Sequence, residues 1–519
     1  MTKPAMTKPA MIKPGRIPLP RSAAGPYSPW LIAVIVSIAT FMEVLDTTIT
    51  NVALRHISGS LGAGLDESTW IITSYLVSNA IVLPISGWLS NVLGRKRFYM
   101  ICVTLFTVAS LMCSLSTSLN FMIVMRVLQG IGGGGLAPAE QSMLADTFPP
   151  SQRAKVFALY GFTVLVAPAI GPVVGGWLTD NLSWHWVFLI NLPFGVISLV
   201  LTWLFVQEPE VLKAERRALL AGGFKVDFVG FAMVAIGFGA LQVVLDQYER
   251  EDGFSSMFIV TLAAISLVCL AFLAVWEWDH PHPAVDIRLL RFKNFAISAV
   301  VMFIIGFMLM SSTQLLPQMS QTLLGYDATT AGLSLGIGGM MTAGLMPIAG
   351  LITSKIRPGV ILSVALVALG LAMLHVTTLS LDMDFWDVSW ARSYQVFALP
   401  FLFIPISAAS YVGLPANKSN EAAAISNLMR NLGGSIGVAF ASIWLQNRIQ
   451  FHHARLAEHI TANADLHGQT LAQFAQTVQT QSSMMAYIDV YYMLALVAFC
   501  VWPITLLLKS PKKGAPIGH

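Results

Sequence analysis

Charged residues are scarce in this sequence, because Asp, Glu, Lys and Arg together make up only 11% of its 519 residues. Soluble domains carry about 25% charged residues. Apolar residues reach 55% here, and the mean hydropathy is +0.70. A helical span needs roughly 20 mostly apolar residues, so fourteen spans would take up about 280 residues and leave no room for a large soluble domain. The composition predicts an integral membrane protein.

Patterns that would indicate other functions are also missing. The four cysteines fall in apolar runs, which excludes a disulfide framework and a zinc site. The net charge is only +4 and the basic residues are scattered, which argues against binding nucleic acid. The sequence has no P-loop for an ATP-driven pump, and no paired histidines or clustered cysteines for a redox subunit. We expect a non-enzyme that needs no metal and no cofactor.

Fourteen apolar runs are long enough to cross a bilayer, which predicts an all-α membrane protein. They form groups of six, two and six, so we expect two six-helix bundles and two extra membrane helices. The predicted divisions are a disordered tail (1–29), an N-terminal bundle (30–206), a linker with the extra helices (207–294), a C-terminal bundle (295–508) with an outer loop (446–485), and a second tail (509–519). The spans lie near residues 30–54, 69–90, 98–118, 121–145, 154–177, 185–206, 228–246, 256–276, 295–316, 329–352, 359–379, 395–413, 421–445 and 486–508.

Basic residues indicate the orientation, since short loops rich in Lys and Arg stay in the cytoplasm. If both termini are cytoplasmic, 23 of the 30 basic residues lie inside and two, Arg126 and Arg430, lie within spans. The five outside are Arg55, Arg250, Arg392, Arg448 and Arg455. This asymmetry predicts cytoplasmic termini and an even number of spans. Asp246 and Glu277 end the two extra helices, where we expect a charge to need no burial.

An internal repeat relates the second helices of the two bundles. Pro-Ile-Ser-Gly at 84–87 and Pro-Ile-Ala-Gly at 347–350 each precede a basic turn. Repeated halves around a central cavity are the usual construction of secondary transporters, in which one half rocks against the other. The repeat therefore favours transport by alternating access.

Four ionisable residues lie inside spans one and four, where a charge costs on the order of 3 kcal/mol and usually faces a wet cavity. Glu43 and Asp46 are three residues apart and share a helix face. Arg126 and Glu140 are close to four helical turns apart, so they also share a face. These residues are our candidates for proton coupling.

The depths of these residues predict how they pair. Asp46 and Arg126 both lie in the outer part of the membrane, where a contact is feasible, while Glu140 lies deeper toward the cytoplasm, where it could take up and release a proton. The alternative is that Asp46 and Arg126 form a permanent structural ion pair and that Glu140 merely reaches the interface. Arg430 and the adjacent Asn431 are further polar residues, in span thirteen.

Glycines and prolines concentrate in span five. Proline removes a backbone donor and bends a helix, while glycine allows close helix approach. Their combination predicts a hinge, although ordinary tight packing would use the same residues. The hinge residues are Pro168, Gly171, Pro172, Gly175 and Gly176.

Taken together, these segments resemble the major facilitator superfamily, and within it the fourteen-span drug and proton antiporters of the EmrB/QacA type. The matching segments are LDTTITNVAL (45–54), GWLSNVLGRKR (87–97), RVLQGIGGG (126–134), APAIGPVVGG (167–176) and SNLMRNLGGSIG (426–437). The resemblance implies the major facilitator fold with two extra helices. It also implies that Asp46 and Arg126 take part in proton-coupled switching, and that residues 168–176 form an export-associated hinge.

The resemblance also implies a gating turn after span two, on the cytoplasmic side. Its residues here are Gly87, Asn91, Gly94, Arg95 and Lys96. The family usually has an Asp where this sequence has Asn91. An Asn accepts a hydrogen bond but cannot neutralise a cation, which leaves the charge-relay part of this motif in doubt.

The long outer loop suggests protein partners. Its apolar residues follow helical spacing on either side of Gly468, which predicts two short helices. The family resemblance implies that they dock a periplasmic membrane-fusion adaptor joined to a TolC-like outer-membrane channel. The loop histidines, which we interpret as polar surface rather than a metal site, are His452, His453, His459 and His467.

The sequence thus predicts a proton-driven multidrug exporter of the bacterial inner membrane. Its substrates would be small lipophilic compounds, its energy source the proton gradient and its surroundings the lipid bilayer. Two alternatives stay open: a proton-coupled carrier of one metabolite on the same scaffold, and a membrane receptor without flux.

Overall fold

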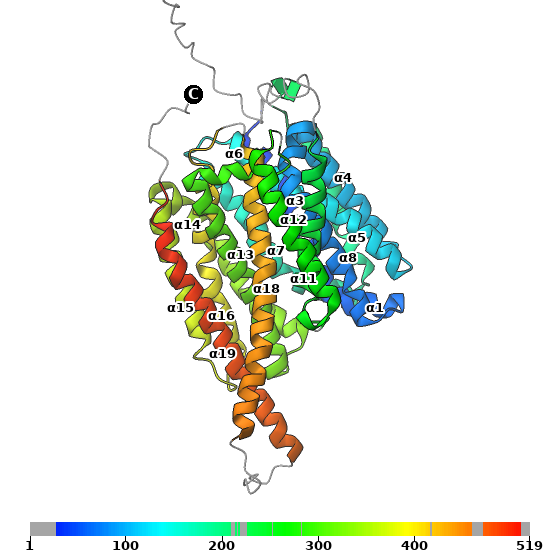
Figure 1. Ribbon diagram of the computed structural model, residues 1–519, viewed down its shortest axis with the longest axis vertical. Helices are drawn as coiled ribbons and strands as arrows, with labels where there is room; N and C mark the ends of the chain where they lie inside the picture. Colours follow the sequence, from blue (N-terminus) through cyan, green and yellow to red (C-terminus); the bar gives the residue numbers. More distant parts are fainter. Residues whose placement is uncertain are drawn as a thin grey trace, which may run out of the picture.

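The computed structural model describes residues 27–208, 213–214, 216–217, 226–251, 253–281, 283–415, 418–458 and 471–509, and these residues are almost entirely helical (Figure 1). Most of both predicted tails lies outside the described residues. The N-terminal half contains α1 (Pro29–Leu61), α2 (Leu65–Ser68), α3 (Trp70–Leu93), α4 (Arg95–Ser114), α5 (Leu119–Gly133), α6 (Leu136–Thr147), α7 (Arg153–Asn181), α8 (His185–Leu189) and α9 (Asn191–Phe205). The linker contains α11 (Phe228–Gln247), η1 (Gly253–Ser255), α12 (Met257–Asp279) and η2 (Ile287–Arg291). The C-terminal half contains α13 (Lys293–Leu324), α14 (Ala328–Lys355), α15 (Pro358–Val376), α16 (Phe385–Phe397), α17 (Leu399–Ala409), α18 (Ser419–Glu458) and α19 (Leu471–Thr505).

Eleven helices of the described chain are long and apolar enough to cross a membrane, or twelve if α7 is counted as one bent span. The predicted spans at 395–413 and 421–445 do not meet this test. The first is divided into the short helices α16 and α17, and the second begins within α18, in which polar residues interrupt the apolar ones. Fourteen spans and two cytoplasmic termini stay predictions.

The helices run between two ends of one bundle (Figure 1). We call the end that holds the turn between α3 and α4 the basic end, because Arg95, Lys96 and Arg97 lie there. We call the opposite end, where α18 and α19 project together, the hairpin end. Between the halves, α7 packs along α14 and α3 packs along α18.

The two linker helices lie outside the six-helix halves. Helix α11 packs on α3 and touches α18, where Ser435 donates a 3.2 Å hydrogen bond to Gln242, while α12 packs on α11. The expectation that the acids at their ends need no burial is wrong for Glu277. Glu277 is fully buried and accepts a hydrogen bond from the Val285 amide, and Asp246 accepts one from Thr73 of α3. Glu277 thus fixes the turn that follows α12, and the half-buried Asp246 joins α11 to α3.

The outer loop does not form two separate short helices. Its described parts continue α18 to Glu458 and begin α19 at Leu471, so both membrane helices extend past the bundle as a hairpin. Asp489 joins them, because its carboxylate lies 2.5 Å from Arg448 and 2.7 Å from His452. Residues 459–470, with His459 and His467, lie outside the described residues. Hydrophobic spacing predicted helices here but could not show that they continue the spans.

Helices α13 and α18 cross closely because glycines line the crossing. A Cβ added at Gly306 would collide with the carbonyl of Arg430, and one at Gly433 would collide with the carbonyl of Phe303. A Cβ at Gly437 would lie 2.5 Å from the Phe307 carbonyl oxygen. Small residues at such crossings let helices approach without a side chain between them.

We expect Gly433→Ala to lower the free energy of unfolding by about 1–3 kcal/mol, because the added methyl group overpacks the α13–α18 crossing. Gly344 on α14 is the matched control, since a Cβ there meets nothing within 4 Å. Gly344→Ala should be neutral or slightly stabilising, as alanine favours helices. Thermal unfolding of the purified protein in detergent measures both variants. Equal effects would show that the crossing tolerates a methyl group.

Candidate functional site

The centre of the N-terminal half is a buried ion pair between α1 and α5. Asp46 is 0% exposed and Arg126 is 1% exposed, and the Arg126 Nη1 lies 2.7 Å from Asp46 Oδ2. The guanidinium also donates to the Ile71 carbonyl at 3.0 Å and to Gln129 Oε1 at 2.8 Å, and it lies 4.4 Å from the ring centroid of Tyr75. The structure therefore brings together the two residues that the sequence paired by depth.

The second oxygen of Asp46 is held by neutral donors. Gln129 Nε2 donates to Asp46 Oδ1 at 2.9 Å, and Asn191 Nδ2, from α9, donates at 2.6 Å. The carboxylate thus accepts three hydrogen bonds from two helices. The sequence reasoning missed Gln129 and Asn191 because it searched only for charges inside spans; polar residues in apolar runs were the available signal.

Glu43 lies one turn before Asp46 and contacts a different set of groups. Tyr75 donates its hydroxyl to Glu43 Oε1 at 3.0 Å, and Asn79 donates at 3.4 Å. In the part of the chain that the structure describes, no basic group lies within ion-pair distance of Glu43. Tyr75 therefore contacts both the Arg126 guanidinium, through its ring, and Glu43, through its hydroxyl.

Glu140 lies on α6, nearer the basic end, and is fully buried. Ser37 of α1 donates to Glu140 Oε1 at 2.5 Å, while Oε2 has no hydrogen-bond partner. Span four is not one continuous helix, because Gly134 and Gly135 separate α5 from α6. Arg126 and Glu140 nevertheless both face α1, one on each side of this break. All three predicted carboxyl groups thus lie on or against α1.

Arg430 and its neighbours form a second polar cluster, between the halves. Tyr160 of α7 donates to Asn427 of α18 at 2.8 Å, and Asn427 donates to Gln141 of α6 at 2.6 Å. Arg430 donates to the Tyr160 hydroxyl at 3.3 Å and to Asn431 at 3.5 Å. The predicted residues Arg430 and Asn431 are therefore adjacent to this contact between the halves.

The predicted gating turn lies at the basic end, against α18. Gly94 has a φ of +86°, a conformation that favours glycine, and Lys96 donates to the Trp203 carbonyl at 2.9 Å. A Cβ at Gly87 would lie 2.9 Å from Cα of Glu421, so α3 and α18 meet almost backbone to backbone there. Asn420 of α18 donates to Asn91. The turn thus takes part in joining the halves.

Arg95 of this turn has a counter-ion elsewhere in the chain. It pairs with Asp146, at the end of α6, and both residues contact Ser419 at the start of α18. The missing carboxylate at Asn91 therefore does not leave Arg95 without a counter-ion. The sequence reasoning missed Asp146 because it looked for the acid within the motif.

A charged anchor fixes the start of α18 next to this contact. Lys418 Nζ lies 2.9 Å from Asp286 and 3.0 Å from Glu421, and Arg288 lies 2.7 Å from Asp286. Burial alone would raise the pKa of Asp286, but hydrogen bonds from Arg288 and Lys418 outweigh it and leave this pKa below its ordinary value. The linker thereby holds the segment that touches Gly87.

The predicted hinge is a bend in α7. The parts before and after residues 168–170 differ in direction by 44°, with Pro168 and Pro172 inside the helix. A Cβ at Gly171 would collide with Thr48, and one at Gly175 would lie 3.2 Å from Cα of Ile49. Gly176 has open space around its Cα. The bend thus packs on α1 two to three residues after Asp46.

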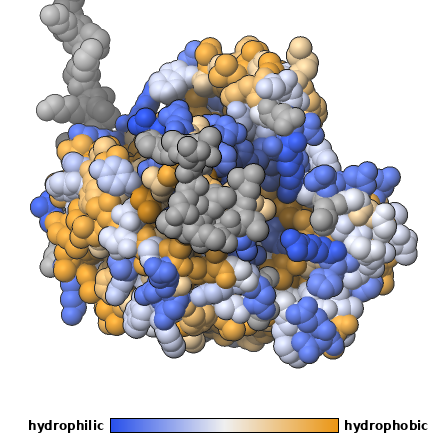
Figure 2. All heavy atoms as spheres, turned by 90° about the horizontal axis from the view of Figure 1, so that it is seen from below, coloured by the Kyte–Doolittle hydropathy of each residue, from blue (hydrophilic) through white to orange (hydrophobic). Residues whose placement is uncertain are grey.

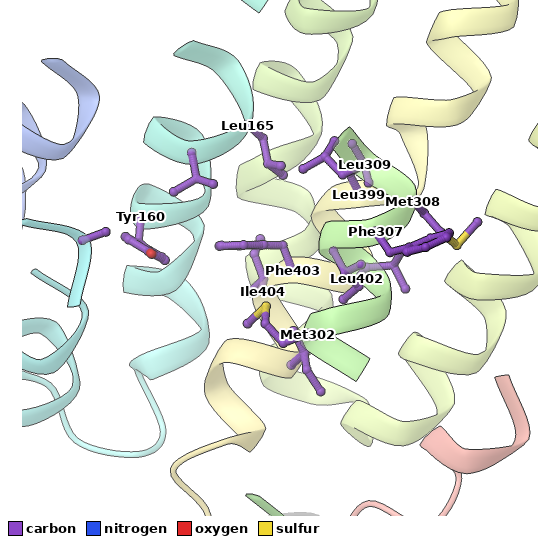
Figure 3. Close-up of a cluster of buried hydrophobic side chains, with 14 of the residues drawn as sticks. Tyr160, Leu165, Met302, Phe307, Met308, Leu309, Leu399, Leu402, Phe403 and Ile404 are labelled. Atoms are coloured by element: carbon purple, nitrogen blue, oxygen red, sulfur yellow. The ribbon is translucent and has the colours of Figure 1, made fainter. Parts of the chain in front are cut away.

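The two ends of the bundle differ in how the halves meet. Toward the basic end, Tyr160 of α7 lies 5.6 Å from Phe403 of α17, ring centroid to ring centroid, and Leu165 points toward the apolar side chains of α13 and α17 (Figure 3). Phe157 stacks on Tyr411 at 5.7 Å. Seen from the hairpin end, the surface is hollowed, with apolar atoms in the depression and polar side chains around it (Figure 2).

Two six-helix halves around buried charges, closed at one end and hollowed at the other, are the architecture of a secondary transporter. Residues 36–438 match the Major Facilitator Superfamily. The chain is 34% identical over 497 residues to the fatty acid resistance protein FarB of Neisseria gonorrhoeae, and this alignment covers 93% of this chain and 96% of that protein. It is 36% identical over 460 residues to the multidrug export protein EmrB of Escherichia coli K12, and this alignment covers 88% of this chain and 88% of that protein. The chain therefore belongs to the major facilitator superfamily, in the EmrB and FarB family of drug and proton antiporters, and is a multi-pass membrane protein.

Solved structures show the same fold at low identity. The human organic anion transporter MFSD10 superposes with a TM-score of 0.61 at 13% identity, over 92% of this chain and 99% of that one. The proton:xylose symporter XylE superposes with a TM-score of 0.59 at 15% identity, over 92% of this chain and 95% of that one. These similarities confirm the major facilitator fold.

We expect Asp46→Asn and Arg126→Gln each to destabilise the protein by about 3–5 kcal/mol, because either change leaves a buried charge without its partner. The double variant should lose less unfolding free energy than the sum of the two single losses, since it leaves no lone charge. Asp66→Asn, on the exposed helix α2, is the control and should have little effect. Thermal unfolding in detergent measures all four variants. Additive losses would show that the two charges are not coupled.

The Asp286 anchor should give a pH-dependent stability. A lowered pKa means that ionised Asp286 stabilises the fold above about pH 4, and this contribution is lost as the pH falls through the folded-state pKa. We expect the free energy of unfolding of wild type to exceed that of Asp286→Asn by about 1 kcal/mol from pH 5 to 8. The value is small because the two cations, Arg288 and Lys418, are about one-third exposed. The difference should shrink below about pH 4. A constant difference down to pH 3 would contradict this ionisation.

Proposed function

We propose that the chain exports lipophilic compounds across the bacterial inner membrane in exchange for protons, by alternating access. The observation that carries this proposal is the row of carboxyl groups along α1, of which Asp46 is held by an arginine while Glu43 and Glu140 are not. A buried carboxyl group without a cation is best accommodated with a proton, which it can release when water reaches it. Such groups are what proton coupling requires.

The contacts suggest how a proton would change the packing. Asp46 joins α1 to α5 through Arg126 and to α9 through Asn191. Protonation of Asp46 would weaken both connections, since a neutral acid attracts the guanidinium far less than a carboxylate does. The bend of α7 packs on Thr48 and Ile49 directly beside this point. A change at Asp46 would therefore alter the packing of α7, the helix that also packs along α14 of the other half.

The closed basic end would be the cytoplasmic gate. We infer that this end faces the cytoplasm, because the basic turns lie there, and that the hollowed face opens to the periplasm. The gate is formed by apolar rings, such as Tyr160 and Phe403, and by close backbone approach at Gly87. Separating these surfaces would expose apolar walls to the cytoplasm, which suits small lipophilic substrates. We infer that both termini are then cytoplasmic and that the chain crosses the membrane fourteen times.

The projecting hairpin supports a partner on the periplasmic side. Helices α18 and α19 extend beyond the bundle as a pair that Asp489, Arg448 and His452 hold together. A stiff projection of this kind could present a surface to a periplasmic membrane-fusion adaptor, and through it to a TolC-like outer-membrane channel. The relatives EmrB and FarB, named for multidrug export and fatty acid resistance, support efflux as the overall function.

Substrate-driven proton release from proteoliposomes tests the proposal, with ethidium and a fluorescent fatty acid as probes. Wild type should release protons when a probe is added and should accumulate the probe under an imposed proton gradient. Glu140→Gln and Asp46→Asn should reduce coupled flux at least tenfold, because neither amide can carry the proton. Asp382→Asn, an exposed acid of the C-terminal half, should transport normally.

The same assay separates the other functions. Probe flux that ignores the proton gradient would exclude antiport, and normal coupling in Glu140→Gln and Asp46→Asn would show that the coupling site lies elsewhere. Absence of flux for both probes in wild type would favour a carrier of one metabolite or a receptor without flux.

A further inference from the structure

The packing of the C-terminal half repeats that of the N-terminal half, helix by helix. Helix α5 packs on α3 and α4, and α16 packs in the same way on α14 and α15. Helix α9 packs on α1 and α4, and α19 packs on α13 and α15. The fourth helix is interrupted in both halves, between α5 and α6 and between α16 and α17. Helices α1, α5 and α9 therefore correspond to α13, α16 and α19.

Arg392 occupies the place in this repeat that corresponds to Arg126. Each is the eighth residue of its helix and is followed three residues later by a glutamine, Gln129 in α5 and Gln395 in α16. Arg126 donates to its glutamine at 2.8 Å and Arg392 donates to its own at 3.3 Å. The sequence analysis placed Arg392 outside the membrane helices. In the structure Arg392 lies within α16 and is only 7% exposed, so it is buried in the bundle rather than on its surface.

The acid that neutralises Arg126 has no counterpart near Arg392. Where α1 supplies Asp46, α13 supplies two hydroxyl groups: Arg392 donates to Ser312 at 3.4 Å and to Thr313 at 2.8 Å. Among the described residues, no carboxylate lies within 4.0 Å of the Arg392 guanidinium. Hydroxyl groups carry no charge, so they do not offset the cost of burying this cation.

The other donors of the site also lack an acceptor. In the N-terminal half, Gln129 Nε2 and Asn191 both donate to Asp46. In the C-terminal half, Gln395 Nε2 is buried without a partner. Tyr491 of α19, the helix that corresponds to α9, lies near Arg392 and close enough to Gln395 for the Gln395 amide to approach its hydroxyl oxygen, while the Tyr491 hydroxyl itself has no acceptor. Three donors thus converge where the first half has a carboxylate.

We propose that the C-terminal half binds a monovalent anion between α13, α16 and α19, held by Arg392, Gln395 and Tyr491. The anion would accept the hydrogen bonds that Asp46 accepts in the other half. Chloride and the carboxylate group of a small organic acid share the required chemistry, a single negative charge with several acceptor directions. The site is fixed in place because Arg392 packs on α14, where a Cβ at Gly338 would lie 3.1 Å from its Cγ.

Equilibrium binding of radiolabelled chloride to the purified full-length protein tests the site directly. The buffer contains sulfate as the only other anion, and octanoate is added in a competition arm. Wild type should bind chloride saturably. Ser312→Asp should bind chloride at least tenfold more weakly, because its carboxylate would supply the acceptor that Asp46 supplies in the first half. Arg392→Gln should also bind chloride more weakly. Gln321→Glu adds the same charge at an exposed position of α13 and should bind like wild type.

A stability measurement keeps the test independent of folding defects. In chloride-free buffer, Ser312→Asp should unfold at a higher temperature than wild type, and added chloride should raise the unfolding temperature of wild type only. Displacement of chloride by octanoate would show that the site also binds organic carboxylates. Saturable binding of octanoate but not of chloride would show that the site binds organic carboxylates only. Absence of saturable binding for both anions, or equal binding in Ser312→Asp, would overturn the proposal. The assay uses no gradient and no flux, so its failure would leave the proposed export function standing.

Discussion

The buried contact between Arg126 and Asp46 is the constraint on which the N-terminal half depends. A guanidinium ion excluded from water needs hydrogen-bond acceptors and a negative charge around it, and an unpaired charge at this depth would cost several kcal/mol. The chain meets this need with groups from four helices: Asp46 of α1, Ile71 of α3, Gln129 of α5 and, through the carboxylate, Asn191 of α9. The geometry of one ion pair therefore fixes how four helices sit together, and one proton on Asp46 would alter all of these contacts.

The contacts between the halves are of a different kind. The ion pairs of Arg126 and Arg95 lie within the N-terminal half, and that of Lys418 joins the linker to α18. Across the interface, neutral groups meet at Tyr160 and Asn427, at Asn420 and Asn91, and at the Gly87 backbone. Charged groups also hydrogen-bond to neutral ones there: Arg430 donates to Tyr160, and Ser419 contacts both Arg95 and Asp146. Each hydrogen bond between neutral groups contributes only about 0.5–1.5 kcal/mol, because water can replace it. The ion pairs of Arg126 and Arg95 have both partners within the N-terminal half, so separating the halves would not require these two pairs to break.

The sequence predicted the features that carry a strong local signal. Long apolar runs gave the helices, and the cost of charge in a bilayer singled out Asp46, Arg126, Glu140 and Glu43, of which the first two lie in contact. The neutral ligands Gln129 and Asn191 gave no comparable signal, since an amide in a span is less costly than a charge. The burial of Arg392 gave no signal because α16 is short and polar, so the predicted apolar run begins after this residue.

Long-range packing explains the remaining differences. Hydrophobic spacing correctly indicated helix on both sides of the outer loop, but it could not show that α18 and α19 continue unbroken past the bundle. Nor could it show that Glu277 is buried, because that depends on Val285 folding back onto α12. In each case the deciding contact joins residues from different elements, which no local pattern encodes.

The two halves share one scaffold but satisfy their buried arginines differently. In the first half the negative charge is part of the chain, so under the proposed mechanism the site would respond to a proton on Asp46. In the second half the corresponding position on α13 is neutral, so the site can respond only to something that brings a charge with it. The same three-helix contact that Asp46 stabilises among α1, α5 and α9 would then depend, among α13, α16 and α19, on the anion content of the surroundings. A repeated fold in which one half lacks this carboxylate would thereby gain a second input, and each half would be controlled by a different ion under the two proposals.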